Sequence, residues 1–402
     1  MKNEPKIRIK GFEGEWETDK LGNLFSERVE SDVHAEMLSV TLSQGIIKAN
    51  ENGRYDNSNN DKSKYRLVKV GDIAYNSMRM WQGASGYSPY YGIVSPAYTV
   101  VVPNNDVDSL LFSYLFKTAN MIKQFRLNSQ GLTTDTWNLK YPAFSKIEIT
   151  YPIDLSEQRA IANYFRHLDS LIETADKKLS SLKQVKEASL QTMFPQEGQS
   201  VPKVRFKGFE GEWKEARLGD MGKTFSGFGF PIEEQGGCCG TPFYKVSDMN
   251  NIGNETIMRS SNNYVKENQV KKHGWKICQQ IPAIFFAKVG AAVLLDRKRL
   301  VLEPCLCDNN TMLYSLAKDS WDAFFCLNLF ETIRLASLSQ IGTLPSYNGT
   351  AVENLQVKIP DLSEQRAIAS FFVHLDKQIE LAQQRVALLR RIKSACLDEM
   401  FV

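Results

Sequence analysis

The apolar positions of residues 154–194 follow a regular helical spacing. Steps of four and three residues alternate along this stretch, and the same steps recur along residues 361–401. A stripe with an average spacing of 3.5 residues is typical of a coiled-coil seam. Its members are Ile161, Phe165, Leu168, Ile172, Ala175, Leu179 and Leu182 in the first stretch, and Ile368, Phe372, Leu375, Ile379, Ala382, Val386 and Leu389 in the second. We predict two long helices that pair with each other; the alternative is two separate helices, each packed on its own domain.

Both predicted helices open with capping residues. Asp154 or Ser156 can cap the first helix, with Glu157 at capping-box spacing, and the same residue types recur 207 positions later. At a rise of 1.5 Å per residue, some 38 helical residues extend roughly 57 Å. Because the first helix carries the chain away from its domain and the second must carry it back, we expect antiparallel pairing and an approximate two-fold axis.

The chain is two copies of one unit. Residues 6–16 (Lys-Ile-Arg-Ile-Lys-Gly-Phe-Glu-Gly-Glu-Trp) return almost unchanged at 203–213, and residues 154–194 match 361–401 without a gap at about half of the positions. The segments between these blocks, 23–150 and 220–357, show no evident similarity. The predicted organisation is a globular domain at 1–153, a helix at 154–194, a linker at 195–202, a second domain at 203–360 and a second helix at 361–402.

The sequence patterns of the two globular domains predict mixed α/β folds. Short β-rich runs are separated by Gly, Pro and Asn; they are Ala97–Val102, Lys146–Tyr151, Ala283–Ala287 and Gln356–Ile359. Helical patterns occur at Ser109–Phe125 and Ser320–Leu335. The predicted fold class is therefore α+β, with two mixed domains joined by two long antiparallel helices in a pseudo-two-fold arrangement.

Composition and charge exclude several classes of protein. The 402 residues are 43% hydrophobic and carry a net charge of +3, so a nucleic-acid surface would have to be local. The longest apolar run, Ile281–Leu295, contains Lys288 and is too short to span a bilayer. The N-terminus lacks the apolar core of a signal peptide, and the seven cysteines are odd in number. We expect a cytoplasmic protein with no membrane contact.

Motifs for catalysis are weak. The loop at Gly219–Thr224 is two residues short of a Walker A motif, and no histidine belongs to a recognisable nucleophile motif. The pairs Cys238-Cys239 and Cys305-x-Cys307 lack the spacing of zinc ligands, so we expect buried free thiols and no metal. The sequence predicts a protein that is not an enzyme and binds no cofactor itself.

Two segments have the composition of recognition surfaces. One mixes amide, guanidinium and aromatic groups with glycines, which suits a loop that reads bases; its candidates are Asn76, Arg79, Trp81, Gln82, Ser85 and Tyr87. The other, residues 266–299, has eight Lys or Arg against two acidic residues, as phosphate contact requires; its candidates are Lys271, Lys272, Lys288, Arg297, Lys298 and Arg299. The alternatives are core aromatic residues in the first segment and a solvated charged face in the second.

These features resemble a known family. The run Leu-Ser-Glu-Gln-Arg-Ala-Ile-Ala opens each long helix at Leu155–Ala162 and Leu362–Ala369, after each of two divergent domains. The runs Gly71–Asn76, Gly92–Tyr98 and Phe286–Ala292 add to the likeness. The arrangement resembles the specificity subunit of type I restriction-modification systems.

The resemblance implies a non-catalytic reader of double-stranded DNA with two target recognition domains. Two adenine-N6 methyltransferase subunits and motor/nuclease subunits would bind it, and S-adenosylmethionine, ATP and magnesium would be bound by those partners. The helix positions would form the scaffold and the partner-docking surface: Glu157, Gln158, Arg159, Ile161, Phe165, Leu168, Ile172, Leu179, Glu364, Gln365, Arg366, Ile368, Phe372, Leu375, Ile379 and Leu389. The competing hypothesis is a coiled-coil scaffold whose end domains bind proteins.

Overall fold

The computed structural model describes residues 3–42, 44–52, 61–316, 321–339 and 344–402. The chain folds as two compact units: the first contains Met1–Asp176 and Gln384–Val402, and the second contains Lys177–Gln383. Each long helix is shared between the units. Helix α5 (Leu155–Met193) begins in the first unit and ends in the second, and α10 (Leu362–Glu399) begins in the second and ends in the first.

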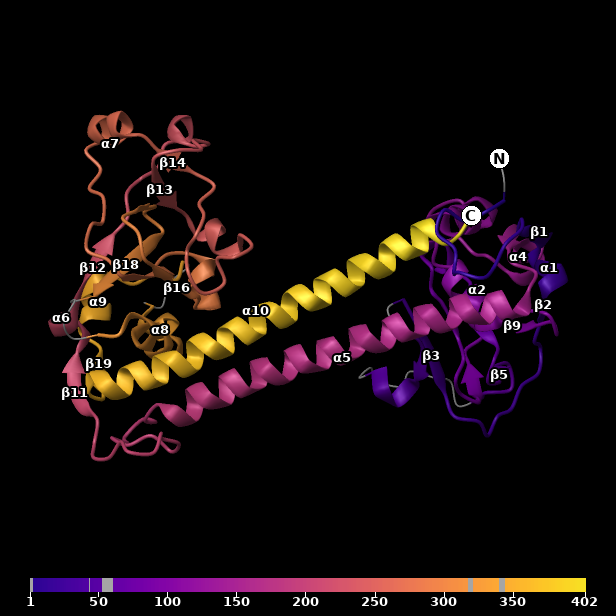
Figure 1. The fold of residues 1–402 in the computed structure, drawn as a ribbon, viewed down its shortest axis with the longest axis horizontal. Helices are drawn as coiled ribbons and strands as arrows, with labels where there is room; N and C mark the ends of the chain where they lie inside the picture. The colour runs from indigo at the N-terminus through magenta and orange to yellow at the C-terminus, as the bar shows by residue number, and fades with distance from the viewer. Residues whose placement is uncertain (1–2, 43, 53–60, 317–320, 340–343) are drawn as a thin grey trace. The chain divides into compact units, whose positions relative to one another are not determined.

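The first unit is built on a four-stranded antiparallel sheet with the strand order β2-β9-β6-β7, of which β2 and β9 are labelled in Figure 1. Its elements besides the long helices are β1 (Glu17–Lys20), α1 (Leu21–Leu24), β2 (Phe25–Glu27), β3 (Leu38–Thr41), β4 (Gly45–Lys48), η1 (Ala49–Asn52), β5 (Arg66–Val68), β6 (Ile73–Asn76), η2 (Met80–Gln82), β7 (Ser85–Tyr87), β8 (Gly92–Val94), β9 (Tyr98–Pro103), α2 (Ser109–Leu115), α3 (Ala119–Asn128), α4 (Tyr141–Phe144) and β10 (Glu148–Tyr151).

The second unit has a four-stranded antiparallel sheet with the order β12-β18-β15-β16. Its elements are β11 (Lys214–Arg217), α6 (Leu218–Met221), β12 (Gly222–Ser226), η3 (Ile232–Glu234), β13 (Thr241–Tyr244), η4 (Val246–Asn250), β14 (Tyr264–Val265), α7 (Glu267–His273), β15 (Ala283–Ala287), η5 (Ala291–Leu295), β16 (Lys298–Val301), β17 (Leu306–Cys307), β18 (Thr311–Leu316), α8 (Ala323–Thr332), η6 (Leu335–Leu338), α9 (Gly349–Glu353) and β19 (Gln356–Ile359).

The two units share one topology, which the unlike sequences of their domains do not reveal. The order β2-β9-β6-β7 corresponds strand by strand to β12-β18-β15-β16, and the outer pair β1-β10 corresponds to β11-β19. The hairpin β3-β4 corresponds to β13-β14. A parallel bridge joins Met37 to Ile93 in the first unit, and β13 pairs in parallel with β17 in the second. The duplicated backbone therefore extends through the domains, while the side chains differ.

Both sheets are buried on two faces because a separate core packs on each face, and successive strand residues point into different cores. In β6, Tyr75 packs into the core that contains α2 and α3, whereas Ala74 packs with β3 and β4. In β15, Phe286 packs with α8 and Phe285 packs on the other side. Every position of β15 is buried, which accounts for the uninterrupted apolar run in this part of the sequence.

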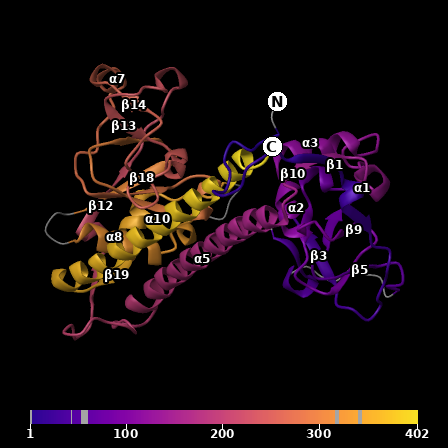
Figure 2. The ribbon, with the colours of Figure 1, turned by 45° about the vertical axis from the view of Figure 1, so that its right-hand side comes forward.

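The long helices pair in an antiparallel manner within each unit, as predicted (Figures 1 and 2). In the first unit, Lys393 Nζ on α10 lies 2.5 Å from Asp169 Oδ1 on α5. In the second unit, Lys186 Nζ on α5 lies 2.9 Å from Asp376 Oδ1 on α10. The two ion pairs are related by the 207-residue offset. Lys186, which interrupts the apolar stripe in the sequence, therefore has an interhelical role.

The predicted capping boxes are only half formed. Asp154 Oδ1 accepts from the backbone N–H of Ser156 at 2.7 Å, and Asp361 Oδ1 accepts from that of Glu364 at 3.0 Å, so both aspartates cap their helices. The carboxylate of Glu157 accepts two 2.8 Å hydrogen bonds from Arg8. An arginine of the repeated peptide, rather than the backbone of the cap, is thus the carboxylate's partner.

The predicted elements differ from the observed ones mainly at their ends. The helical pattern at Ser109–Phe125 forms two helices because Thr118 starts α3, its hydroxyl accepting from Met121 N at 3.4 Å. Helix α8 starts after its cap Asp322, which accepts from Phe324 N and Phe325 N. Ser320, the predicted first residue of that helix, lies outside the described residues.

Candidate functional site

The recognition candidates of the first domain lie on the hairpin between β6 and β7. The Asn76 side chain accepts a hydrogen bond from Met78 N at 3.0 Å, and Trp81 Nε1 donates to the Met78 carbonyl at 3.0 Å. These bonds fix the turn, while Arg79 and Gln82 are exposed. The hairpin tip therefore presents a guanidinium and an amide, the groups that form paired hydrogen bonds with guanine and adenine.

Lys117 forms hydrogen bonds with the backbone of this hairpin. Its Nζ donates to the carbonyls of Gly83 and Ser85, the latter at 2.7 Å. Gly83 has a φ of +82°, a left-handed conformation that glycine adopts without strain. Burial, with repulsion from Lys393, lowers the pKa of Lys117 to about 8.

A second loop, residues 129–139, packs beside the hairpin. The rings of Trp81 and Trp137 meet edge to face with centroids 5.4 Å apart, and the Arg126 guanidinium lies 5.4 Å from the Trp137 ring centroid. The backbone N–H of Leu139 donates to the Ser77 carbonyl at 2.8 Å. Sequence reasoning missed Trp137 and Arg126, which join Trp81 in one aromatic and cationic surface.

The second domain has a hairpin in the corresponding position. Its hairpin runs from β15 through η5 to β16 and carries Lys288 and Arg297. The Tyr347 N–H donates to the Lys288 carbonyl at 3.2 Å, as Leu139 does to Ser77 in the first domain. The dipeptide Ser-Gln begins this loop at 129–130 and recurs in the sequence at 339–340, and it is the sequence signal that could have identified the loop. The two segments chosen for different compositions thus include topologically equivalent hairpins.

Two of the candidates are buried. Ser85 is fully buried in β7. Lys298 is 4% exposed, and its Nζ donates to the Ile333 carbonyl at 2.8 Å and pairs with Asp296 at 2.9 Å. Burial lowers the pKa of Lys298. Neither side chain is available to DNA, which corrects the prediction; their place in strands, where alternate residues point inward, is the reason.

The two arginines next to Lys298 differ in exposure. Arg299 is half-buried, and burial followed by repulsion from Arg297 lowers its pKa. Arg297 is exposed, and its Nη1 donates to Asn250 Oδ1 at 2.6 Å. Arg297 is therefore the exposed cation of this hairpin, while Lys288, like Arg299, is half-buried.

Lys271 and Lys272 lie on α7, which is separate from the hairpin (Figure 1). Lys271 pairs with Glu267, and Lys272 pairs with Glu234, each at 2.6 Å. Glu234 also accepts from Gln269 at 2.7 Å, and its hydrogen bond from Lys272 is the main reason that its pKa is lowered to about 2. The basic excess seen in composition is therefore divided between two places and partly neutralised by carboxylates.

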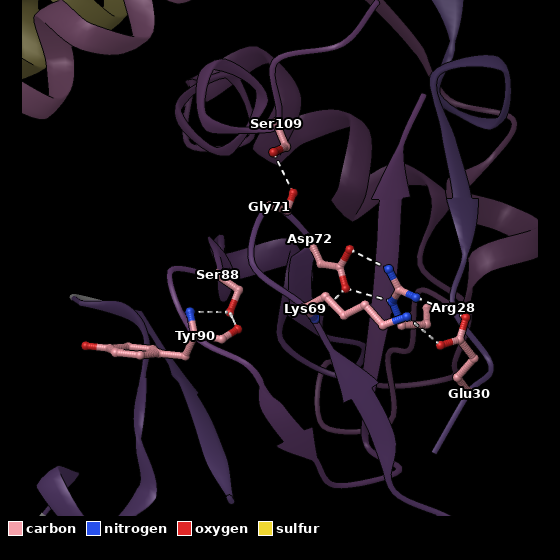
Figure 3. A network of polar contacts seen from close by, with 8 residues as sticks. All are labelled: Arg28, Glu30, Lys69, Gly71, Asp72, Ser88, Tyr90 and Ser109. Atoms are coloured by element: carbon pink, nitrogen blue, oxygen red, sulfur yellow. Dashed lines mark hydrogen bonds and ion pairs between the residues drawn. The ribbon is translucent and has the colours of Figure 1, made fainter. Parts of the chain in front are cut away.

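A buried ion pair braces the first hairpin at its other end (Figure 3). Asp72 accepts from Arg28 Nε at 2.7 Å and Nη2 at 2.9 Å, and from the backbone N–H of Lys69 at 2.7 Å. The hydrogen bond to Asp72 raises the pKa of Arg28 despite its burial. Ser109 Oγ donates to the Gly71 carbonyl at 2.6 Å, which ties this turn to α2.

The predicted scaffold and docking residues divide by exposure. Glu157, Gln158, Glu364 and Gln365 are at most 2% exposed and bond within the chain, so they cannot contact a partner. Gln158, for example, accepts from Asp108 N at 2.8 Å. Arg159 and Arg366 are exposed. Of the apolar stripe, Ile161, Phe165, Leu168, Ile368, Phe372 and Leu375 are buried, and Ile172, Leu179, Ile379 and Leu389 are half-buried.

The cysteines differ from the expectation of buried thiols at two positions. Cys238 and Cys239 are exposed, while Cys305 and Cys307 are buried, and burial raises the pKa of Cys307 to about 12. Across the described ranges, no three His, Cys, Asp or Glu side chains gather as metal ligands would. No described helix combines the length and apolar character needed to cross a bilayer.

Comparison with known proteins gives a consistent family. Residues 14–184 and 210–391 match the type I restriction modification DNA specificity domain. The chain is 24% identical over 318 residues to the MjaIX specificity subunit of a type I restriction enzyme from Methanocaldococcus jannaschii, covering 75% of this chain and 70% of the relative. It is 22% identical over 350 residues to the MjaVIII specificity subunit of the same organism, covering 84% and 79%.

Solved structures show the same fold. The S subunit of a type I restriction-modification system from M. genitalium has a TM-score of 0.64 at 14% identity, with 99% of each chain covered. A chain from a structure of the type I R-M system, described for its complex assembly and conformational transition, has a TM-score of 0.58 at 15% identity, with 96% of this chain and 97% of that chain covered.

Proposed function

Because both of its halves match the type I restriction modification DNA specificity domain, the chain belongs to that family as a specificity subunit, and we propose that it reads a bipartite, asymmetric double-stranded DNA target. Each globular domain reads one half of the target. The single observation that supports this most is the pair of topologically equivalent hairpins with unlike side chains: Arg79 and Gln82 on one, Lys288 and Arg297 on the other.

The parts of the chain that differ between the two copies would read bases, and the parts that repeat would form the frame. Sequence is read by side chains that meet base edges, so two unlike hairpins suit two unlike half-sites. The repeated peptides are almost unchanged and the helices are identical at about half of their positions, which suits a common frame. The unread base pairs between the half-sites would be set by the length of that frame.

The chain itself supplies no reaction in this proposal. Two adenine-N6 methyltransferase subunits and the motor/nuclease subunits dock on the exposed faces of α5 and α10. Those partners bind S-adenosylmethionine, ATP and magnesium. The complex works in the cytoplasm, where its DNA lies.

Methylation mapping tests the proposal. The chain is co-expressed with its methyltransferase subunits, and methylated adenines are located by single-molecule sequencing; a two-part asymmetric motif is expected. Replacing residues 23–150 with the corresponding domain of another family member should change one half of that motif. A change in both halves would contradict reading by separate domains.

DNA pulldown distinguishes a protein-binding scaffold. A DNA reader should retain its target duplex with a preference over scrambled duplex and lose it as salt rises. Retention without sequence preference or salt dependence would favour the scaffold.

A further inference from the structure

A groove lies in the first unit between the start of α5 and the first domain. It has a cavity volume of about 360 Å³. One wall is the exposed side of α5, with Arg159, Asn163 and Arg166. The facing wall comes from the domain and includes Tyr87 at the end of β7 and the exposed Asn105. No step of the proposed base reading uses this groove.

Its α5 wall carries two cations that lack acidic partners. Among the described residues, Arg159 has no hydrogen bond or ion pair, and Arg166 donates only to Asn163 Oδ1, at 2.7 Å. The two arginines are seven residues apart, which places them on one helix face about 10 Å apart along the axis. The lining contains one carboxylate, Asp108, and its Oδ1 accepts from Leu111 N at 3.0 Å at the start of α2. The helix N–H groups offset that negative charge.

The facing wall is held rigidly. Gly71, which lines the groove, accepts from Ser109 Oγ at 2.6 Å and donates its N–H to the Ser88 carbonyl at 3.0 Å (Figure 3). The adjacent Asp72 is clamped by Arg28. A ligand would thus meet a preformed backbone on this side of the groove, where little ordering would oppose its binding.

Strand β7 connects the groove to the hairpin tip, and this connection points to DNA as the ligand of the groove. β7 is an edge strand of three residues that begins after the hairpin tip and ends at Tyr87 in the groove. A duplex read at the tip therefore has a backbone within reach of the groove. Two guanidinium groups, a phenol and an amide together offer the donors that phosphate oxygens accept, and arginine matches them with paired hydrogen bonds.

Duplication argues against a partner protein in the groove. Two identical partner subunits would be expected to meet equivalent residues in both units, and Arg159 does have a counterpart in Arg366. At the position that corresponds to Arg166, however, α10 carries Val373. The pair of cations belongs to one half of the molecule.

We propose that this groove binds the phosphodiester backbone of the DNA beside the half-site read by the first domain, with Arg159 and Arg166 as the phosphate contacts. The inference rests on the proposed function and adds the backbone contacts that orient the duplex on the hairpin. Because phosphates carry no sequence, these residues contribute affinity and register without choosing bases.

The test uses the full chain assembled with its methyltransferase subunits. Fluorescence anisotropy measures binding of target and scrambled duplexes across a NaCl series for wild type and the R159Q/R166Q variant. The variant should lose affinity for both duplexes by the same factor, and the slope of log affinity against log salt should become shallower by about two units. The methylated motif should stay the same.

Two control variants accompany it. R391Q removes one exposed arginine from α10 in the same unit and should leave the salt slope unchanged. R159K/R166K keeps both charges and should keep the slope while losing affinity, because lysine cannot form the paired hydrogen bonds. Thermal unfolding shows whether each variant is folded.

Three outcomes would overturn the inference. If the slope of log affinity against log salt in R159Q/R166Q equals that of wild type, no phosphate is bound in the groove. Loss of methyltransferase assembly with an unchanged slope means that a partner protein occupies it. If the wild-type complex shows no sequence preference, the proposed function is contradicted, and the phosphate contacts in the groove are contradicted with it. The wild-type measurement alone identifies this outcome.

Discussion

Arg8 and Glu157 form a paired ion bridge that fastens the repeated peptide of residues 6–16 to the first turn of α5. Arg8 Nε and Nη2 each donate to one carboxylate oxygen at 2.8 Å, and Arg205 and Glu364 repeat the contact with two bonds of 2.7 Å. Each repeated peptide also forms a hydrogen bond with the last turns of the long helix that ends in its unit. In the first unit, the Ile7 N–H donates to the carbonyl of Glu399 at the end of α10. The equivalent bond in the second unit joins Val204 N to Thr192 O. The near-constant blocks of the sequence are therefore the parts that contact one another.

Removing Arg8 should destabilise the first unit. In Arg8→Ala the Glu157 carboxylate, only 3% exposed, stays buried without its partner, which should cost about 3 kcal/mol. Urea unfolding of the full chain measures the change. Lys6→Ala is the control, since the Lys6–Glu399 pair is largely exposed and should contribute far less. Equal losses in the two variants would contradict the importance of the buried bridge.

Lys186 should specify how α5 and α10 align in the second unit. Burial lowers its pKa, but Glu331 and Asp376 outweigh burial and raise it overall. Lys186→Met leaves two partly buried carboxylates facing each other and should lower the melting temperature. Adding Glu331→Gln and Asp376→Asn should restore much of the loss, because the repulsion disappears. Lys377→Met, in an exposed pair, should have little effect; no recovery in the triple variant would contradict this account.

Arg79 should read a base in one half of the target. If its guanidinium pairs with a guanine, Arg79→Ala should weaken binding by about 1–3 kcal/mol and relax the preference at that one position. Competition binding with duplexes randomised at single positions measures this. The half-site of the second domain is an internal control and should be unaffected. A uniform loss over all sequences would instead indicate a phosphate contact.

Lys117 should make stability depend on pH. Its pKa is about 8 in the folded chain and near 10.5 when unfolded, so the unfolded chain binds more protons between these values. The free energy of unfolding should therefore rise with pH across this window in wild type, relative to Lys117→Met. Urea midpoints at pH 7.5 and pH 10 check the difference. Identical pH dependence in both proteins would show that Lys117 does not titrate in this range.

Helix length should set the spacing of the target. Inserting four residues into both α5 and α10 lengthens each helix by about 6 Å, close to two base pairs at 3.4 Å each. The methylated motif should keep both half-sites and gain base pairs between them. Sequencing of methylated adenines reads the spacer, and an unchanged spacer would rule out this ruler role.

The sequence determined the elements whose signal is periodic or repeated. The 3.5-residue stripe located both long helices, and the duplicated blocks implied their antiparallel course, because a stripe records directly which side of a helix is buried. The sequence also singled out the segment that carries Arg79 and Gln82, since amides, guanidinium groups and glycines are close together there; the structure shows that the segment is a hairpin, and base reading by it stays a prediction.

Only the tertiary structure decided which charges are free and which residues far apart in sequence meet. Composition counted Lys298 as a phosphate contact, but strand alternation buries it, and Lys272 is neutralised by Glu234 from a distant segment. The common topology of the two domains was hidden because backbone pairing constrains side chains weakly once a core is filled. Trp137 reaches Trp81 across more than fifty residues, a contact that local pattern cannot encode.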